Sequence, residues 1–256
     1  MKIILTCTTT FDRLDIFSSG IQSLLNQSLV PDLFVVNLAE DEFEPMGANK
    51  IPEWLNHPRV TVQLTKDTGS YKKLIPTFHF ANPHDLLITA DDDVMYHQKW
   101  LENLVNTSKA NPNYIICTRA RKMRKNIFNN WTNYRSWKNV RSQQTSLYLI
   151  PIGVGGVVYQ KRLLDMDFLL NNDYMKIAPG TDDLWFKMGS FRKNVPVMAI
   201  PSNFDKNVSI EHNKGLRMLN LKGKKDNFLF RLFCNYIGIN LNRNDENWDA
   251  ILAIDN

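Results

Sequence analysis

The stretch Asp85-Leu-Leu-Ile-Thr-Ala-Asp-Asp-Asp-Val-Met-Tyr96 joins a short apolar run to three consecutive aspartates, Asp91, Asp92 and Asp93. An apolar run of this length predicts a buried β-strand, and alternation along it would send Asp91 and Asp93 to one side and Asp92 to the other. Three adjacent carboxylates in a partly desolvated site cost several kcal/mol unless a cation neutralises them. The triplet therefore predicts a cation site, with a solvated acidic turn before the next helix as the alternative.

The donor atoms of this triplet also indicate which cation it would hold. All are hard carboxylate oxygens, and no cysteine or paired histidine lies nearby in the sequence. Oxygen ligands of this kind suit magnesium or manganese better than zinc. We therefore expect Mn²⁺ or Mg²⁺ as the cofactor.

Around this stretch, strands and helices alternate along the chain. Short apolar or β-branched runs predict strands at about 2–8, 33–38, 60–64, 85–90, 114–119 and 195–200. Apolar stripes at helical spacing predict three helices, with the residues Leu14, Phe17, Ile21, Leu24 and Leu25, then Trp100, Leu101, Leu104 and Val105, then Leu184 to Phe191. This order predicts an α/β fold with a mostly parallel, Rossmann-like sheet flanked by helices, and a ligand beyond the carboxyl ends of the strands.

The length of 256 residues favours one domain, since domains average about 150 residues but α/β domains often run longer. We assign residues 1–222 to this domain and residues 223–256 to a C-terminal extension. Two helices are predicted there, at 226–241 and 244–254, packed back on the domain. The first is dense in aromatic residues, so peripheral contact with a membrane is the alternative to core packing.

Three cysteines far apart in the sequence form neither a disulfide framework nor a zinc pattern, which fits a reducing cytoplasm. The apolar run at the N-terminus is too short, and the residues after it are too polar, for a signal peptide, so this segment predicts a strand instead. No stretch reaches 18 consecutive apolar residues, so no membrane-spanning helix is expected. We expect a cytoplasmic protein, with the inner face of the membrane as a site of attachment.

The net charge of +5 hides a strong asymmetry along the chain. Residues 103–164 contain eleven Lys or Arg and no Asp or Glu, so the remaining residues sum to −6. Within 119–141, basic residues are followed by aromatic residues at intervals of three, Phe128, Trp131, Tyr134 and Trp137. This basic-aromatic tract favours an anionic, ring-bearing ligand. Nucleic acid, a phospholipid surface and a sugar phosphate all fit, and a solvated basic loop is the alternative.

A second acidic motif follows in Pro179-Gly-Thr-Asp-Asp-Leu-Trp-Phe186. Thr181 is a candidate N-cap, and acidic residues in a first helical turn commonly stabilise a helix, by about 0.3–1 kcal/mol each. The upstream glycines of Gly153-Val-Gly-Gly156 would allow a backbone to approach a bound ligand closely. Each motif alone is weak, and their combination favours a functional site.

Together these motifs resemble the GT-A nucleotide-sugar glycosyltransferases, specifically family 2 and its bacterial capsule and surface-glycan relatives. The resemblance covers about residues 2–215. It rests on Leu5-Thr-Cys-Thr-Thr-Thr-Phe-Asp-Arg13, Ser23-Leu-Leu-Asn-Gln-Ser28, Thr89-Ala-Asp-Asp-Asp93, Gly153-Val-Gly-Gly156 and Thr181-Asp-Asp-Leu-Trp-Phe186.

The resemblance implies roles for the two acidic motifs. The carboxylates at Asp91 to Asp93 would bind a metal that bridges the nucleotide diphosphate. The acidic pair that opens the later helix would supply the catalytic base, with Asp183 preferred and Asp182 as the fallback. Asp182 stands where the family usually has Glu.

Other candidate residues follow from the resemblance and from their positions near predicted strand ends. Asp67 could read a uracil base, Lys72 or Lys73 could pair with the diphosphate as point charges, and Glu40 could contact ribose or belong to a solvated acidic run. The set proposed to bind the nucleotide sugar is Thr8, Arg13, Glu40, Asp67, Lys72, Lys73, Asp91, Asp92, Gly155 and Gly156. The candidate metal ligands are Asp93, Asp91 and His212, and the candidate acceptor-binding residues are Trp131, Tyr134 and Trp137.

The function implied is transfer of a hexose-type sugar from a nucleotide sugar, with uridine diphosphate favoured as the nucleotide, to a glycan or lipid-linked glycan in surface polysaccharide synthesis. A metal can stabilise the leaving diphosphate, and one carboxylate base accepts the acceptor's proton, so a single displacement would invert the anomeric configuration. The alternatives are a nucleic-acid-binding protein that uses 119–141, a nucleotidyltransferase and a silent sugar-nucleotide binder. The aspartate triplet argues against the first, and the lack of glycine after the opening strand argues against the second.

Overall fold

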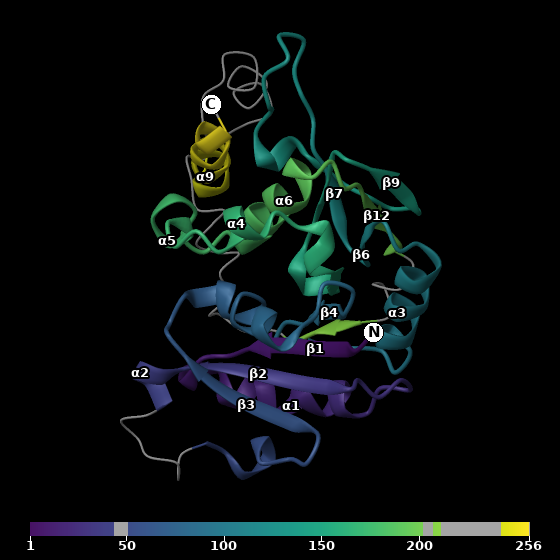
Figure 1. The fold of residues 1–256 in the computed structure, drawn as a ribbon, viewed down its shortest axis with the longest axis vertical. Coiled ribbons are helices and arrows are strands. Elements are labelled where there is room, and N and C mark those ends of the chain that lie inside the picture. Colours follow the sequence, from purple (N-terminus) through teal and green to yellow (C-terminus); the bar gives the residue numbers. More distant parts are fainter. Residues whose placement is uncertain (44–50, 202–206, 211–241, 256) are drawn as a thin grey trace.

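In a computed structural model, the structure describes residues 1–43, 51–201, 207–210 and 242–255. Its centre is an eight-stranded sheet in the order β3-β2-β1-β4-β11-β6-β12-β9. Figure 1 shows this sheet with helices packed around it. The α/β fold class expected from the alternating pattern is confirmed.

Six strands of the central sheet run in the same direction, and they are the six that the sequence predicts. They are β1 (Ile3–Thr8), β2 (Leu33–Ala39), β3 (Val60–Thr65), β4 (Leu86–Thr89), β6 (Ile115–Cys117) and β12 (Val197–Ala199). The other two, β9 (Gln144–Ser146) and β11 (Val157–Tyr159), are antiparallel to their neighbours and were not predicted. β6 and β12 are equally short but lie within longer apolar runs, whereas β9 is Gln-Thr-Ser and β11 directly follows the glycine motif.

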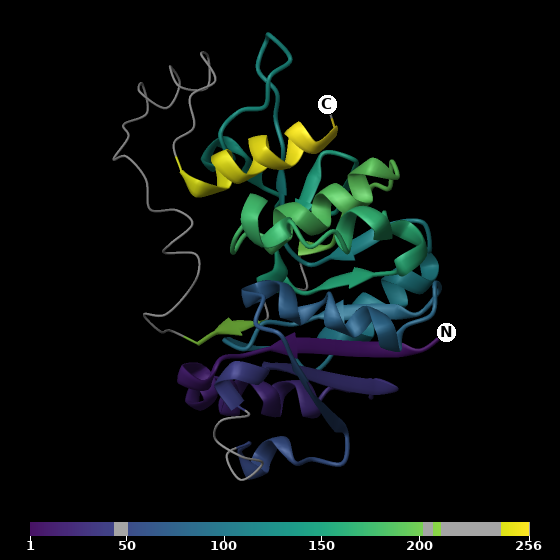
Figure 2. The ribbon, with the colours of Figure 1, turned by 60° about the vertical axis from the view of Figure 1, so that its left-hand side comes forward.

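Two smaller sheets complete the strand structure. One joins β10 (Leu149–Pro151), β7 (Ala120–Lys122) and β8 (Lys138–Asn139), and the other joins β13 (Val208–Ser209) to β5 (Val94–Met95). The basic-aromatic tract at 119–141, for which no strand was predicted beyond residue 119, includes two short antiparallel strands. Between β7 and β8 the chain projects away from the body of the molecule, as Figures 1 and 2 both show.

The three helices predicted next to strands are present, and the third is buried on all sides instead of along one stripe. They are α1 (Leu14–Leu25), α3 (Trp100–Ala110) and α6 (Asp182–Arg192). Shorter α-helices are α2 (Glu40–Phe43), α4 (Met166–Leu169) and α5 (Tyr174–Ile177), and α9 (Arg243–Leu252) lies near the C-terminus. Single 3₁₀ turns occupy Phe11–Arg13, Glu53–Leu55, Gly69–Lys73, Pro76–Phe80, Tyr134–Ser136, Gly153–Gly155, Lys161–Leu163 and Ala253–Asp255.

Both faces of the sheet are covered by apolar side chains. On β1, Leu5 and Cys7 pack on the side of α1 and α3, whereas Ile4 packs on the side of α6. This two-sided burial is the reason that the inner parallel strands are apolar runs in the sequence, whereas the edge strand β3 alternates apolar and polar residues. It also directs the polar residues that follow each strand to the carboxyl edge of the sheet.

The described part of the C-terminal extension packs on the domain as expected. The ring of Trp248 on α9 lies 5.9 Å from that of Trp131 and 6.0 Å from that of Trp137, measured between ring centroids. The predicted helix at 226–241 and the proposed boundary at 222/223 lie outside the described residues. Among the helices that the structure describes, none combines the length and apolar character needed to cross a membrane.

Candidate functional site

The antiparallel strand β11 brings the glycine motif to the same edge as the aspartate triplet. Val157, at the start of β11, pairs with Thr89 at the end of β4. An antiparallel strand begins where its neighbour ends, so Gly153–Gly156 and Asp91 meet at the carboxyl edge of the sheet. Crevices at this edge are the usual ligand sites of open α/β sheets.

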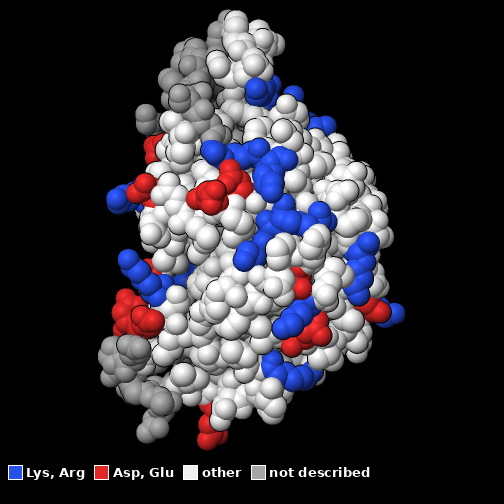
Figure 3. Space-filling model, in the orientation of Figure 1, with Lys and Arg blue, Asp and Glu red and all other residues white. Residues whose placement is uncertain are grey.

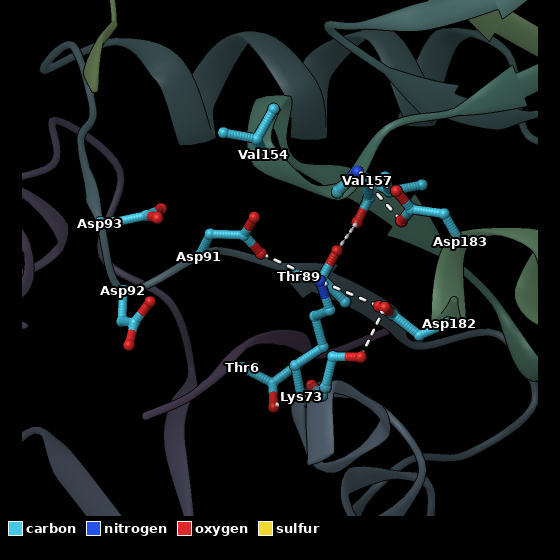
Figure 4. Close-up of polar contacts among 12 residues, drawn as sticks. Thr6, Lys73, Thr89, Asp91, Asp92, Asp93, Val154, Val157, Asp182 and Asp183 are labelled. Atoms are coloured by element: carbon cyan, nitrogen blue, oxygen red, sulfur yellow. Dashed lines mark hydrogen bonds and ion pairs between the residues drawn. The ribbon is translucent and has the colours of Figure 1, made fainter. Parts of the chain in front are cut away.

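Lys73 connects the two acidic motifs. Its Nζ lies 3.0 Å from Asp91 Oδ1 and 3.0 Å from Asp182 Oδ2, although the motifs come from β4 and from the start of α6. Figure 4 shows the ammonium group between these two carboxylates. Burial alone would lower the pKa of Lys73, but Asp182, Asp91 and Asp183 outweigh it and hold this pKa well above its usual value. Lys73 is therefore a fixed positive charge at the centre of the site.

Asp183 is held by the backbone instead of by a cation. The N–H of Gly153 donates to Oδ1 at 3.0 Å and to Oδ2 at 3.1 Å. Burial and, after it, the charge of Asp182 raise the pKa of Asp183, Lys73 opposes the rise, and the net result is a pKa of about 7. A carboxylate with a pKa near the ambient pH is suited to accept a proton.

Asp182 differs from Asp183 because its negative charge is already balanced by an ion pair. One oxygen pairs with Lys73, and the other accepts a hydrogen bond of 2.6 Å from the hydroxyl of Ser70. Ser70 was not singled out in the sequence, since an isolated serine in a polar segment carries no signal. These contacts favour Asp183 over Asp182 as the group that takes up a proton.

The other two aspartates of the triplet share Arg13. Its Nε donates to Asp92 at 2.9 Å, and its Nη2 pairs with Asp92 and, at 3.1 Å, with Asp93. Thr9 also donates to Asp92, at 2.7 Å. Arg13 and Thr9 belong to the loop after β1, so the predicted role of this loop at the site is consistent with its position. Within the triplet, Asp91 therefore pairs with Lys73, whereas Asp92 and Asp93 both pair with Arg13.

Five carboxylates and two cations meet here, which leaves a formal excess of three negative charges. The carboxylates are Asp91, Asp92, Asp93, Asp182 and Asp183, and the cations are Lys73 and Arg13. Within the described residues, no three carboxylate, imidazole or thiolate groups converge to hold a metal ion. The donor chemistry still fits magnesium or manganese, because such ions are commonly held by one or two carboxylates together with substrate phosphates.

Lys72 and Asp67 form a second ion pair at the end of β3, and Lys72 is almost completely buried. Burial by itself would raise the pKa of Asp67, but the hydrogen bonds from Lys72 and from the N–H of Gly69 lower it overall. Asp67 remains partly exposed at the strand end, as expected. Lys72, which was expected to be available to a diphosphate, is instead occupied by Asp67.

Two further predicted contacts lie at neighbouring strand ends. The hydroxyl of Thr8 donates to the backbone carbonyl of Asn37 at 2.7 Å, which ties β1 to β2. Glu40 begins α2 and is exposed. Both residues lie at the carboxyl edge, and among the described residues neither has a hydrogen bond or ion pair to the Lys73 cluster.

The glycines have a different division of roles from the one expected. A Cβ on Gly155 would lie 2.6 Å from Thr118 Oγ1, and one on Gly156, where φ is +89°, would lie 2.3 Å from the ring of Trp100. Gly155 and Gly156 therefore make room for packing within the protein. Gly153, not predicted as a site residue, is the glycine that faces the charged cluster: a Cβ there would lie 2.8 Å from Lys73 Nζ.

The three aromatic residues assigned to the acceptor pack together with α6 and α9. Trp137 is only 2% exposed, and its indole N–H donates to the carbonyl of Thr132. A ring so buried offers little surface to a ligand, so its packing role replaces the expected acceptor contact. Trp131 and Tyr134 are partly buried, and an acceptor role for them stays a prediction. His212 lies outside the described residues.

Two other residues near the site were missed by sequence reasoning. Tyr96 accepts a hydrogen bond of 2.8 Å from the N–H of Asp91 and donates one of 3.3 Å to the carbonyl of Val154, so it ties the triplet to the glycine turn. Lys187 lies one helical turn after Asp183 and is buried, and within the described residues its Nζ has no hydrogen-bond partner. Burial lowers the pKa of Lys187 to about 7. No local pattern distinguishes either residue from ordinary core or surface positions.

The fold and the site define an α/β protein with a mixed eight-stranded sheet and a carboxylate-rich cluster at its carboxyl edge. No protein-family model and no curated protein matches the chain.

Proposed function

We propose that the protein is an inverting glycosyltransferase of the GT-A type that uses a nucleotide-sugar donor. The observation that carries this proposal is the meeting, at one sheet edge, of an aspartate triplet and a separate carboxylate, Asp183, with a pKa raised to about 7. Such a pair of acidic groups suits a displacement in which one side holds a departing diphosphate and the other receives a proton.

Asp183 is the proposed base. It would accept the proton of the acceptor hydroxyl as that oxygen attacks the anomeric carbon, while the bond to the diphosphate breaks. The N–H of Gly153 fixes the orientation of the carboxylate of Asp183. Lys73 forms its ion pair with Asp182 and not with Asp183, so Asp183 is the member of the acidic pair that is open to accept a proton. General-base catalysis of this kind contributes about 10²–10⁴-fold.

Asp91 and Asp93 are the proposed holders of Mn²⁺ or Mg²⁺. Bound there, the ion would supply Lewis-acid stabilisation of charge on the leaving diphosphate. The excess of negative charge, three when Asp183 is ionised and two when it is protonated, supports a divalent cation at this place. Lys73 and Arg13 would remain beside the diphosphate, as fixed positive charges that orient the carboxylates.

The identity of the donor and acceptor follows from the resemblance. It favours a uridine diphosphate sugar, with Asp67 at the base and Glu40 or Thr8 near the ribose, and a glycan or lipid-linked glycan acceptor in surface polysaccharide synthesis. A β-linked product from an α-linked donor is the expected outcome. Trp131 and Tyr134 are the proposed acceptor contacts, since they keep some exposed surface.

The test separates the two roles by measuring donor binding and transfer independently. A panel of nucleotide sugars is screened for thermal stabilisation with and without Mn²⁺, because a ligand that binds the folded state raises the apparent stability. Asp93→Ala should lose metal-dependent stabilisation. Asp183→Asn should keep it and lose transfer by about 10²–10⁴-fold. Asp15→Asn, an exposed acid on α1, is the control and should change neither.

Two outcomes would contradict the proposal. If no donor stabilises the wild-type protein, the site does not bind nucleotide sugars. If Asp93→Ala and Asp183→Asn lose donor binding equally, the separation into a metal side and a base side is wrong.

A further inference from the structure

The segment between β7 and β8 forms a preformed hairpin with an apolar tip. Lys125 and Trp131 are bridge partners, and the N–H of Asn126 donates to the carbonyl of Asn130 at 2.8 Å. The side-chain oxygen of Asn126 accepts from the N–H groups of Phe128 and Asn130, both at 3.0 Å. Several backbone groups of the tip are thus satisfied within the hairpin, which lowers the cost of moving the tip out of water.

The residue at this tip is unusually exposed for its type. Ile127 is 87% exposed, the highest value among the large apolar residues described, and its neighbour Phe128 is 55% exposed. In Figures 1 and 2 the hairpin extends beyond the rest of the described chain. An aliphatic side chain as exposed as Ile127, at a projecting tip, adds nothing to the core and fits an apolar partner.

The base of the same hairpin is cationic. Lys122 and Lys138 are exposed and directly opposite each other on β7 and β8, and Arg124, Lys125 and Arg141 are exposed nearby. Like charges that face each other across a strand pair destabilise it, so this arrangement fits an anionic partner that lies against both. Figure 3 shows blue side chains below a largely uncharged end of the molecule.

The hairpin is also rigidly attached. The ring of Trp131 lies 6.4 Å from Trp137 and 5.9 Å from Trp248 between centroids, and the ammonium of Lys125 lies 4.9 Å from the centre of the Trp131 ring. An insertion into a lipid surface would therefore orient the whole domain, because the hairpin stem is packed into the core.

We infer that this hairpin, residues 124–132, docks the protein on an anionic lipid surface, with Ile127 in the interfacial region and the basic residues of its base against the headgroups. An apolar tip next to a basic hairpin base is the arrangement expected of a peripheral membrane contact. The free energy of burying the apolar tip and the attraction of the basic residues to anionic lipid then add together. Nucleic acid would match the basic residues but leaves the apolar tip unexplained. The inference does not depend on the proposed transfer reaction.

Sedimentation of the full chain with vesicles tests this inference. Binding is expected to vesicles that contain phosphatidylglycerol and not to pure phosphatidylcholine, and it should fall at about 0.5 M NaCl, where the Debye length is about 4 Å. Ile127→Ser should reduce the bound fraction several-fold, and Ile127→Trp should retain or increase it, since indole favours the membrane interface. Val30→Ser is the control, since Val30 is also an exposed β-branched residue, at 55%, and lies outside the hairpin.

A charge variant provides the second arm. Lys122→Gln with Arg124→Gln should weaken binding to anionic vesicles, whereas Lys66→Gln with Lys109→Gln, both exposed and outside the hairpin, should not. The inference is overturned if the wild-type chain does not bind anionic vesicles, if Ile127→Ser binds as well as the wild type, or if single-stranded nucleic acid binds and vesicles do not. Because these measurements need no donor or acceptor, they are independent of the test of transfer.

Discussion

The backbone N–H of Gly153 donates to both carboxylate oxygens of Asp183, at 3.0 and 3.1 Å, although thirty positions separate the two residues. Gly153 precedes the antiparallel strand β11, and Asp183 lies in the first turn of α6. This contact fixes the proposed base without a second charged partner. It also explains the glycine, since a side chain at this position would intrude on the cluster.

The first prediction concerns the space around that glycine. A Cβ on Gly153 would lie 2.8 Å from Lys73 Nζ and 3.0 Å from Asp183 Oδ1, both at the ends of side chains that can shift. Gly153→Ala should therefore lower the free energy of unfolding by only about 1 kcal/mol. Gly156→Ala should lower it by about 3 kcal/mol or more, because its Cβ would meet the ring of Trp100 and its φ is +89°.

Urea denaturation of both variants measures this difference. Gly153→Ala should also lose transfer, since Asp183 must rotate away from its position. Equal destabilisation by the two substitutions would mean that the surroundings of Gly153 are as rigid as those of Gly156.

The second prediction concerns the pH dependence of stability at Asp183. Its pKa is about 7 in the folded protein and 3.8 in the reference state, so the folded state holds an additional proton between these values. The contribution of this group to stability is therefore present at low pH and lost as the pH rises through about 7. Asp183→Asn should raise the Tm relative to the wild type more at about pH 8 than at about pH 5.

Thermal unfolding at the two pH values checks this, with Asp15→Asn as the exposed control. A difference in Tm that does not grow with pH would show that Asp183 is ionised in the folded protein at low pH. In the wild type, transfer should also fall as the pH drops below about 7, because the base is then protonated.

The third prediction concerns the buried lysine behind the site. Lys187 is 1% exposed, and its Nζ lies 5.4 Å from the ring centre of Phe191. Burial lowers its pKa from 10.5 to about 7, so the unfolded chain holds the additional proton between these values and stability rises with pH across this window. Lys187→Met, similar in volume, should stabilise the protein at about pH 6 and much less at about pH 10.

Denaturant titrations at both pH values give the comparison. Lys193→Met is the control, since Lys193 is exposed and directly follows the last residue of α6. A Lys187→Met variant that is destabilised at about pH 6 would reveal a favourable role for the charged ammonium.

The fourth prediction concerns the arginine that holds two aspartates. Arg13 contacts Asp92 through two nitrogens and Asp93 through one, in a largely buried arrangement. Lysine presents a single point charge and cannot span both carboxylates. Arg13→Lys should therefore cost about 2 kcal/mol of unfolding free energy.

The control is Arg192→Lys, at the more exposed ion pair with Asp165, which should cost less than about 1 kcal/mol. Chemical denaturation measures both. Equal losses would indicate that the geometry of Arg13 contributes nothing beyond its charge.

Much of the fold was predictable because its signals are local. Five of the six parallel strands are apolar runs buried on both faces, the edge strand β3 alternates apolar and polar residues, and α1 and α3 have apolar stripes at helical spacing. The acidic motifs were also visible, since Asp91 to Asp93 and the Asp182-Asp183 pair stand directly after a strand and at the start of a helix. The strand-end rule predicts the place of Asp91 to Asp93, whereas the meeting of the Asp182-Asp183 pair with them was an expectation from the family resemblance.

The connections within the site were not predictable in this way. The three-residue strand β11 carries no readable period, yet its direction decides that Gly153 meets Asp183. Lys72 and Lys73 are identical neighbours in the sequence, but one pairs with Asp67 and the other with Asp91 and Asp182. Likewise, aromatic spacing alone could not distinguish a ligand platform from the buried contact of Trp137 with Trp248.

The sequence by itself determined the six parallel strands and the longer helices α1, α3, α6 and α9, and that carboxylates follow a buried strand, because burial patterns and charge repulsion act between residues close in the chain. Only the tertiary structure decided which carboxylate is neutralised by Lys73 and which is left with a raised pKa. Electrostatic and hydrogen-bond energies depend on distances in space of a few ångströms, and these distances are set by strand direction and packing between residues far apart in the chain.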